Sequence, residues 1–63
     1  MISDETIVKL FDKRGGCILE VHLSSPGAVL VEIEASKARL RRGEIGYFEV
    51  IRPRQPVERI MSA

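Results

Sequence analysis

Residues 17–35 read Cys-Ile-Leu-Glu-Val-His-Leu-Ser-Ser-Pro-Gly-Ala-Val-Leu-Val-Glu-Ile-Glu-Ala. Every second residue is apolar in 17–23 and again in 29–35, which is the pattern of a strand that buries one face. Between these two runs, the sequence Ser24-Ser25-Pro26-Gly27 is typical of a turn. The stretch therefore predicts a β-hairpin formed by residues 17–23 and 29–35.

The register of this predicted hairpin follows from its faces, because residues that lie opposite each other share a face. A five-residue loop over 24–28 sets Val21 opposite Val31 and buries the two apolar sets together. Cys17 belongs to the apolar set, and we interpret it as a small core residue. His22 lies five positions away on the opposite face, so the two do not form a nucleophile and its base.

Four polar side chains share the other face of the predicted hairpin: Glu20, His22, Glu32 and Glu34. Such a group could hold a cation or act as paired carboxylates. An open sheet face removes little water from these side chains, so it shifts their pKa values little. We interpret them as a solvated acidic face or as half of a charged contact.

Residues 4–13 carry the signals of a short helix. Ser3 can cap its first turn, the first turn is acidic, the last is basic, and Gly15 follows. Three apolar residues have helical spacing: Ile7, Leu10 and Phe11. The competing interpretation is a strand over 6–11, which has poor alternation because both of its faces would be apolar.

The second half of the chain predicts a third strand over 45–51, with Phe48 and Val50 facing the core. Gly46 marks a bulge or a close approach of the backbone. The connector 36–44 is either a short helical turn that ends at Gly43 or an irregular basic loop.

Residues 52–63 leave the sheet as a basic tail whose two prolines, Pro53 and Pro56, favour an extended path. Three apolar residues then follow helical spacing: Val57, Ile60 and Met61. A helix this short does not hold alone in water. The tail therefore either docks this stripe on another surface or is disordered.

Together these elements predict one small α+β domain over residues 1–63: a short N-terminal helix on a three-stranded antiparallel meander, with a basic C-terminal tail. The alternative is an all-β, barrel-like fold with a strand over 6–11. The expected core comprises Ile7, Leu10, Phe11, Leu19, Val21, Leu23, Val29, Val31, Ile33, Phe48 and Val50. A chain of 63 residues buries only about 60% of its unfolded surface, so we expect a symmetric homodimer joined by edge strands or by the tail.

The composition bounds the function. One cysteine excludes a disulfide within the chain, and one histidine argues against the usual zinc sites. No apolar run is long enough to span a membrane and no secretory signal is present, so we expect a cytoplasmic protein without a membrane partner. The chain also lacks a nucleophile–base pair, a metal set and a cofactor loop, so we expect neither an enzyme nor a cofactor.

Charge is unevenly divided along the chain. Residues 1–36 hold three basic and six acidic residues, a net of −3, whereas residues 37–63 hold seven basic and three acidic residues, a net of +4. Such a molecule attracts a charged partner or a second copy of itself through one end. The densest basic group lies in residues 37–42.

These observations predict a non-catalytic protein-interaction module, acting as a regulator, inhibitor or assembly factor on another protein or on itself. Its expected contact residues are Lys37, Arg39, Arg41, Arg42, Arg52, Arg54 and Tyr47, with the outward apolar residues Leu30 and Ile51. The alternative is a nucleic-acid-binding regulator that uses the basic connector 37–42. Sparse aromatic residues and a net charge of only +1 count against this alternative.

Overall fold

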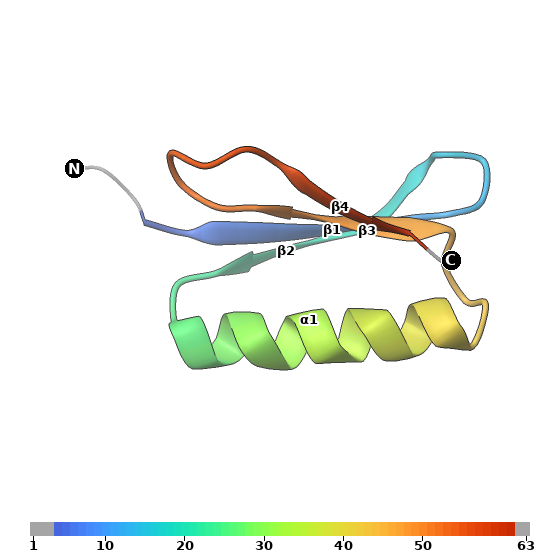
Figure 1. Ribbon diagram of the computed structural model, residues 1–63, viewed down its shortest axis with the longest axis horizontal. Coiled ribbons are helices and arrows are strands. Elements are labelled where there is room, and N and C mark those ends of the chain that lie inside the picture. Colours follow the sequence, from blue (N-terminus) through green and yellow to red (C-terminus); the bar gives the residue numbers. More distant parts are fainter. Residues whose placement is uncertain (1–3, 62–63) are drawn as a thin grey trace.

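The computed structural model describes residues 4–61, and the predicted cap Ser3 lies outside them. Its elements are β1 (Thr6–Phe11), β2 (Cys17–Leu23), α1 (Pro26–Arg41), β3 (Tyr47–Ile51) and β4 (Glu58–Met61). The four strands form one antiparallel sheet in the order β2-β1-β3-β4, and α1 covers one of its faces (Figure 1). The α+β class is confirmed, but the N-terminal helix and the three-stranded meander are wrong.

The segment predicted as an N-terminal helix forms β1, which lies between β2 and β3 in the sheet. Thr6, Val8 and Leu10 are buried on the side of α1, whereas Ile7 and Phe11 are half-buried on the other side. The side chains of an inner strand have neighbours from the strands on both sides, as Phe11 has in Tyr47 of β3. The poor alternation that favoured a helix therefore reflects the inner position of β1.

The turn between β1 and β2 depends on Asp12 and Gly15. Oδ1 of Asp12 accepts hydrogen bonds from the backbone N–H groups of Arg14 (2.8 Å) and Gly16 (2.9 Å), as Asp side chains commonly do in turns. Gly15 adopts a φ of +91°, which glycine tolerates without strain. The turn joins two strands, where the sequence had predicted that it ends a helix.

The segment predicted as the second strand of the hairpin lies within α1. Oγ of Ser25 accepts a hydrogen bond from the N–H of Ala28 (3.0 Å), and Pro26 follows at the first helical position. These residues begin a helix and do not form a hairpin turn. Gly43, with a φ of +76°, ends the helix, as in one of the two interpretations of residues 36–44, and its N–H donates to the carbonyl of Leu40 (3.1 Å).

One side of α1 packs on the sheet. Val29 and Ser36 are buried, and Ile33 and Leu40 pack against the core. Their spacing of four, three and four residues matches one face of a helix. Val31, predicted to be in the core, is 70% exposed. The predicted pairing of residues 17–23 with 29–35 is therefore wrong.

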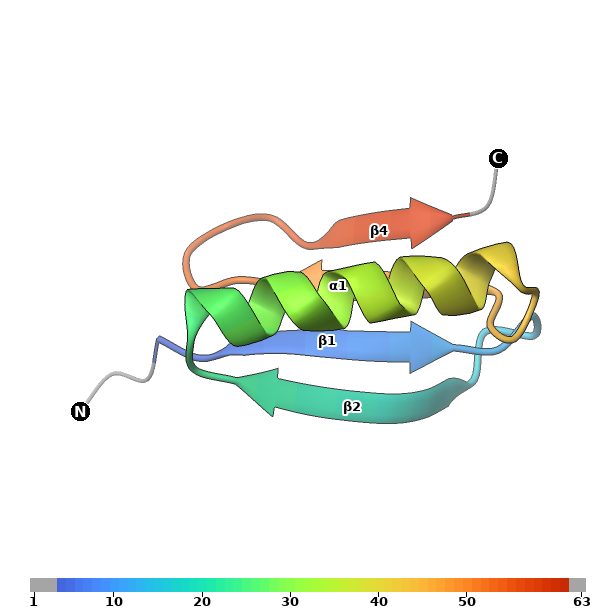
Figure 2. The same ribbon diagram turned by 90° about the horizontal axis from the view of Figure 1, so that it is seen from below.

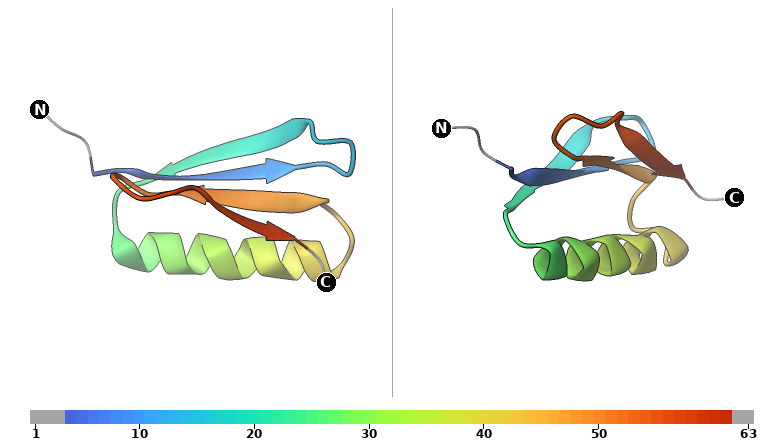
Figure 3. Two further views of the ribbon diagram at one scale, coloured as in Figure 1. Left: turned by 45° about the horizontal axis from the view of Figure 1, so that its top comes forward. Right: turned by 60° about the vertical axis from the view of Figure 1, so that its left-hand side comes forward.

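The chain crosses over β1 between β2 and β3. Both strands pair antiparallel with β1, on opposite sides, so they run parallel to each other and α1 connects them. Seen from below, α1 lies along the middle of the sheet, with β2 and β4 at the edges (Figure 2). The two views in Figure 3 show the twist of the sheet, with α1 along one side of it.

The core lies between α1 and the inner strands. Its buried apolar residues are Val8, Leu10, Val29, Ile45, Phe48 and Val50. Phe48 and Val50 face α1, as predicted, and Tyr47, Glu49 and Ile51 lie on the other face of β3. Two buried residues, Val8 and Ile45, were not predicted to be in the core, because Val8 was expected on a helix and Ile45 at the start of a strand.

The end of the predicted tail is part of the sheet. Residues 58–61 form β4, which pairs with β3. Since consecutive residues of a strand point to opposite faces, Ile60 packs on the side of α1 and Met61 is exposed on the other side. The helical stripe predicted for this segment therefore does not form.

Gly46 is a point of close backbone approach, one of the two roles predicted for it. Its N–H donates to the carbonyl oxygen of Phe11 (2.8 Å). A Cβ atom at this position would lie 2.6 Å from the carbonyl oxygen of Asp12 and 2.8 Å from Cα of Lys13. Both atoms belong to the backbone, so the space cannot be made by rotating a side chain.

We expect Gly46→Ala to lower the free energy of unfolding by about 1–3 kcal/mol, because the turn between β1 and β2 must move away from β3. Urea denaturation followed by circular dichroism measures this change. The control is Gly27→Ala, whose Cβ would meet only Oγ of Ser25 at 4.0 Å. It should raise stability by up to about 1 kcal/mol. Equal effects of the two substitutions would contradict the close approach at Gly46.

Candidate functional site

The sheet face away from α1 has no covering element within residues 4–61 (Figure 1). We call it the open face. Its side chains alternate with those that face α1: Ile7, Lys9, Phe11, Glu20, His22, Tyr47, Glu49, Ile51, Arg59 and Met61. Charged and apolar groups are mixed on this face, and they form two clusters.

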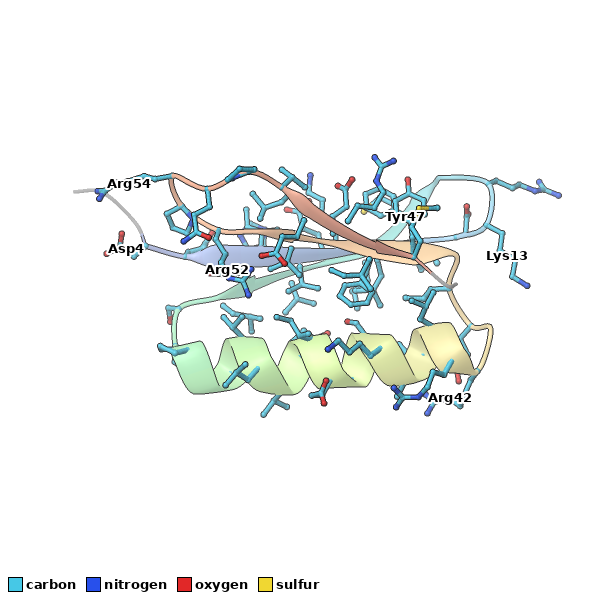
Figure 4. The ribbon with its side chains drawn as sticks, in the orientation of Figure 1. Asp4, Lys13, Arg42, Tyr47, Arg52 and Arg54 are labelled. Atoms are coloured by element: carbon cyan, nitrogen blue, oxygen red, sulfur yellow. The ribbon has the colours of Figure 1, made fainter. Side chains whose placement is uncertain are left out.

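The first cluster surrounds Tyr47, a predicted contact residue. The ring of Tyr47 stacks on that of Phe11, with centroids 4.6 Å apart and planes 9° apart. Cζ of Arg59 lies 5.0 Å from the centroid of Tyr47, and Nε and Nη2 of Arg59 donate to Oε2 of Glu49 at 3.2 and 3.0 Å. These contacts join β1, β3 and β4 on the side away from α1 (Figure 4). Tyr47 therefore stabilises the sheet through its ring.

The second cluster centres on His22. Its Nδ1 lies 2.5 Å from Oε1 of Glu5, and its Nε2 lies 2.5 Å from Oε2 of Glu20. Lys9, which is opposite Glu20 in the ladder, has its Nζ 3.7 Å from Oε1 of Glu20. The hydrogen bonds to Glu5 and Glu20 raise the pKa of His22, and the hydrogen bond from His22 lowers the pKa of Glu20.

This cluster corrects the predicted acidic face. Glu20 and His22 do lie together, but Glu32 and Glu34 lie on α1. Each ring nitrogen of His22 faces a different carboxylate, so the oxygens do not converge on one point. Among residues 4–61, no group of three or more His, Cys, Asp and Glu side chains is placed to hold a metal ion. Cys17 is exposed, so its prediction as a core residue is wrong.

Four of the predicted basic contact residues lie near the C-terminal end of α1: Lys37, Arg39, Arg41 and Arg42. Three of them are paired with carboxylates, Lys37 with Glu34 at 3.5 Å, Arg39 with Glu32 at 3.6 Å, and Arg42 with Glu44. These ion pairs reduce the positive potential of residues 37–42, because Glu32, Glu34 and Glu44 lie beside the cations.

The remaining predicted basic residues, Arg52 and Arg54, lie far from this group. Arg54 is in the loop between β3 and β4, at the opposite end of the molecule from Arg42 (Figure 4). Arg52 follows β3, extends towards α1 and donates from Nη1 to Glu58. The structure therefore does not bring the predicted contact residues together on one surface.

Arg52 also lines an open cavity of about 360 Å³ at the N-terminal end of α1. The walls include the apolar side chains of Leu23, Val29 and Leu30, with Asp4 at the rim. The charge of Arg52 is already engaged by Glu58. The cavity is therefore mainly an apolar recess between the sheet and the start of the helix.

Within residues 4–61, β2 forms one of the two edges of the sheet, and its outer side is unpaired. β2 pairs only with β1 within the described chain, and α1 leaves it uncovered at the side (Figure 2). Ile18 is 55% exposed and Leu19 is 44% exposed. We call the outer edge of Leu19–Leu23 the free edge. A dimer joined by edge strands was predicted, but this edge could not be located from the sequence because residues 17–23 were paired with residues 29–35.

The His22 cluster gives stability a pH dependence. The pKa of His22 is raised above its ordinary value of 6.5, so its contribution is complete below that pH and is lost as pH rises through the raised pKa. Glu20, with its pKa lowered from 4.5, contributes above that pH and loses its contribution as pH falls through the lowered pKa. The cluster is therefore most stabilising between pH 4.5 and 6.5.

We expect the free energy of unfolding to fall as pH rises above 6.5, and this fall to be smaller in His22→Gln, whose amide does not titrate. Urea denaturation at roughly pH 4 to 9 measures both proteins. Glu34→Gln is a matched control, because its carboxylate lies on α1, away from His22. An unchanged fall in His22→Gln would assign the pH dependence to another group.

Among residues 4–61, no helix is both long enough and apolar enough to cross a membrane. The free edge and the open face are surfaces that the sheet leaves uncovered within residues 4–61. Comparisons of the chain with protein-family models, curated proteins and solved structures found no match.

Proposed function

We propose that this protein is a small non-catalytic binding module that receives an extended segment of another polypeptide along the free edge of β2. The supporting observation is an edge strand that carries exposed apolar side chains and lies beyond the cover of α1. Backbone groups on such an edge can form a ladder with an added strand. Binding of this kind suits a regulator, an inhibitor or an assembly factor.

The two edges of the sheet differ in how receptive they are. β2 has seven residues and contains no lysine, arginine or proline, which are the residues that commonly prevent pairing at natural edges. Its two charged side chains, Glu20 and His22, are bonded to each other. β4 has only four residues, and one of them is Arg59, a residue type that discourages pairing at an edge. We therefore assign binding to β2.

The free edge presents a different chemistry on each face of the sheet. On the side of α1 it carries Leu19, Val21 and Leu23, and on the open face it carries Glu20 and His22. Side chains of an added strand alternate between the same two faces. The partner segment is therefore expected to alternate apolar residues with polar or charged ones.

Nucleic-acid binding is the second candidate function, and the basic end of α1 favours it. Lys37, Arg41 and Arg42 are exposed there. Against it, Lys37 and Arg42 form ion pairs with neighbouring carboxylates, and Tyr47 is stacked against Phe11 on the sheet. Protein binding through β2 needs neither a basic surface nor a free aromatic ring, so the geometry favours it.

Selection from a display library of random heptapeptides tests the assignment to β2. We expect the selected peptides to shift the backbone amide resonances of residues 17–23 more than those of residues 58–61 in NMR spectra. Leu19→Lys should weaken peptide binding at least about tenfold, because a lysine at an edge discourages strand pairing.

The matched control for this experiment is Val31→Lys, since Val31 is an exposed apolar residue on α1. It should leave peptide affinity unchanged. Thermal denaturation of both variants establishes that they remain folded. Peptides that perturb the cavity or α1 and leave β2 unaffected would refute the proposal.

A salt series separates the second candidate from the first. We expect no retention of generic duplex or single-stranded nucleic acid at low salt, because the cations of residues 37–42 are largely paired. Fluorescence anisotropy measures binding by the unmodified protein and by Arg41→Glu/Arg42→Glu. A steep decline of affinity with salt that becomes shallower in the double variant would support phosphate contacts and nucleic-acid binding.

A further inference from the structure

We propose that the segment received by the free edge is β2 of a second copy of this chain, giving a symmetric dimer whose two β2 strands pair antiparallel around Val21. This inference rests on the proposed function, because it uses the same edge and names its partner. A chain of 63 residues has a small core, so association that covers further apolar surface is a common means of stabilisation.

Two-fold symmetry restricts the register of such a pair. When two identical strands pair antiparallel around a two-fold axis, the two copies of α1 lie on the same side of the joined sheet. Residues that lie opposite each other then come from the same face of β2. The two-fold axis must therefore pass through a residue and not between two residues. The candidate positions for the axis within β2 are Leu19, Glu20, Val21 and His22.

A β-bulge limits the part of β2 that a second strand can follow. The register of β2 on β1 shifts between Leu10 and Phe11, which makes Ile18 the extra residue on β2. The regular part of the strand is therefore Leu19–Leu23. Its middle residue is Val21, so an axis there uses the whole regular edge.

The charges on the open face also favour a two-fold axis through Val21. An axis through Val21 places Glu20 opposite His22 of the second copy, and His22 opposite Glu20 of the second copy. An axis through Glu20 would place two carboxylates opposite each other, and an axis through His22 would do the same with two imidazoles. Opposite charges across a ladder are favourable and like charges are unfavourable.

The neighbours of His22 support this pairing. Glu5 and Glu20 of the same copy lie 2.5 Å from its two ring nitrogens, and Lys9 lies beside Glu20. The two carboxylates favour a protonated His22. Both N–H groups of His22 are engaged within one copy, so Glu20 of the second copy is attracted across the dimer axis by the charge of the imidazolium and accepts no hydrogen bond from it.

The apolar side chains of the free edge favour the same axis through Val21 as the charged side chains do. An axis through Val21 sets Val21 against its own counterpart and Leu19 against Leu23 of the second copy. Leu19 is 44% exposed, and Val21 and Leu23 are half-buried in a single copy. Pairing at this register would cover all three side chains at once, since they lie on the same face.

Disulfide cross-linking tests the register directly. In the background Cys17→Ser, which removes the native thiol, Val21→Cys places two thiols opposite each other across the proposed axis. Cα atoms of opposite residues are about 4.5–5.5 Å apart, within the range of a disulfide. Glu20→Cys is the control, because its two copies would be diagonal neighbours at about 7–8 Å. We expect a covalent dimer from Val21→Cys and little from Glu20→Cys.

Sedimentation at micromolar concentration tests the association without new thiols. We expect a dimer for the unmodified protein and for Val31→Lys, and a dissociation constant at least about tenfold higher for Leu19→Lys. His22→Glu should weaken the dimer by about 2- to 30-fold, since it places like charges opposite each other twice. Circular dichroism of each variant separates loss of association from loss of folding.

The outcomes distinguish the partner from the edge. If the protein is a monomer at all concentrations and library peptides bind β2, the partner is not a second copy of this chain. The proposed function is then still supported. In a protein that sediments as a monomer, failure of the peptides to map to β2 overturns the proposed function itself, because no second copy then occupies the edge. The proposed register is overturned if Leu19→Lys leaves the dimer intact while Val31→Lys dissociates it. It is also overturned if Glu20→Cys cross-links more efficiently than Val21→Cys.

Discussion

The pairing of β1 with β3 is the contact on which the rest of this structure depends. It joins two hairpins, β1–β2 and β3–β4, that are otherwise formed by neighbours in sequence. In this ladder Val8 lies opposite Val50 and Leu10 opposite Phe48, and all four side chains are buried beneath α1. A two-stranded hairpin alone is marginally stable in water. The helix therefore has a surface to pack on only when these two inner strands lie side by side.

Residues 26–41 show why a helix could be mistaken for a strand from the sequence alone. Apolar residues at alternate positions of 29–33 fit a strand, yet Val29 and Ile33 also fit a helix face that continues through Ser36 and Leu40. Leu30 and Val31 are apolar but exposed; Leu30 interrupts the alternation of a strand and Val31 lies outside the buried face of the helix, so the two patterns are hard to distinguish. Ser25 and Pro26 could have decided the question, because the same residue types that make turns also begin helices. By contrast, β3 and its buried face were predictable, since Phe48 and Val50 alternate cleanly with residues on the open face.

The candidate site was predictable only where its residues lie close together in sequence. Glu20 and His22 share a face on any strand, and that prediction is confirmed. The contact between His22 and Glu5 could not be predicted, because residues 4–13 were expected to be helical. The uneven charge of the two halves has a simple explanation in α1. Glu32 and Glu34 of the acidic half lie beside Arg39 and Lys37 of the basic half, so much of the asymmetry is neutralised within one helix.

The crossover through α1 also bears on the rate of folding. The two hairpins bring together near neighbours, and such contacts form within about 1–10 μs. The β1–β3 ladder instead closes a chain segment over residues 12–46, which carries a larger entropic cost and raises the contact order of the whole domain. A helix that is already formed shortens the distance this segment must search, because it spans only about 1.5 Å per residue. The residues that begin and end α1, Ser25 and Gly43, therefore influence how quickly the two halves of the sheet meet.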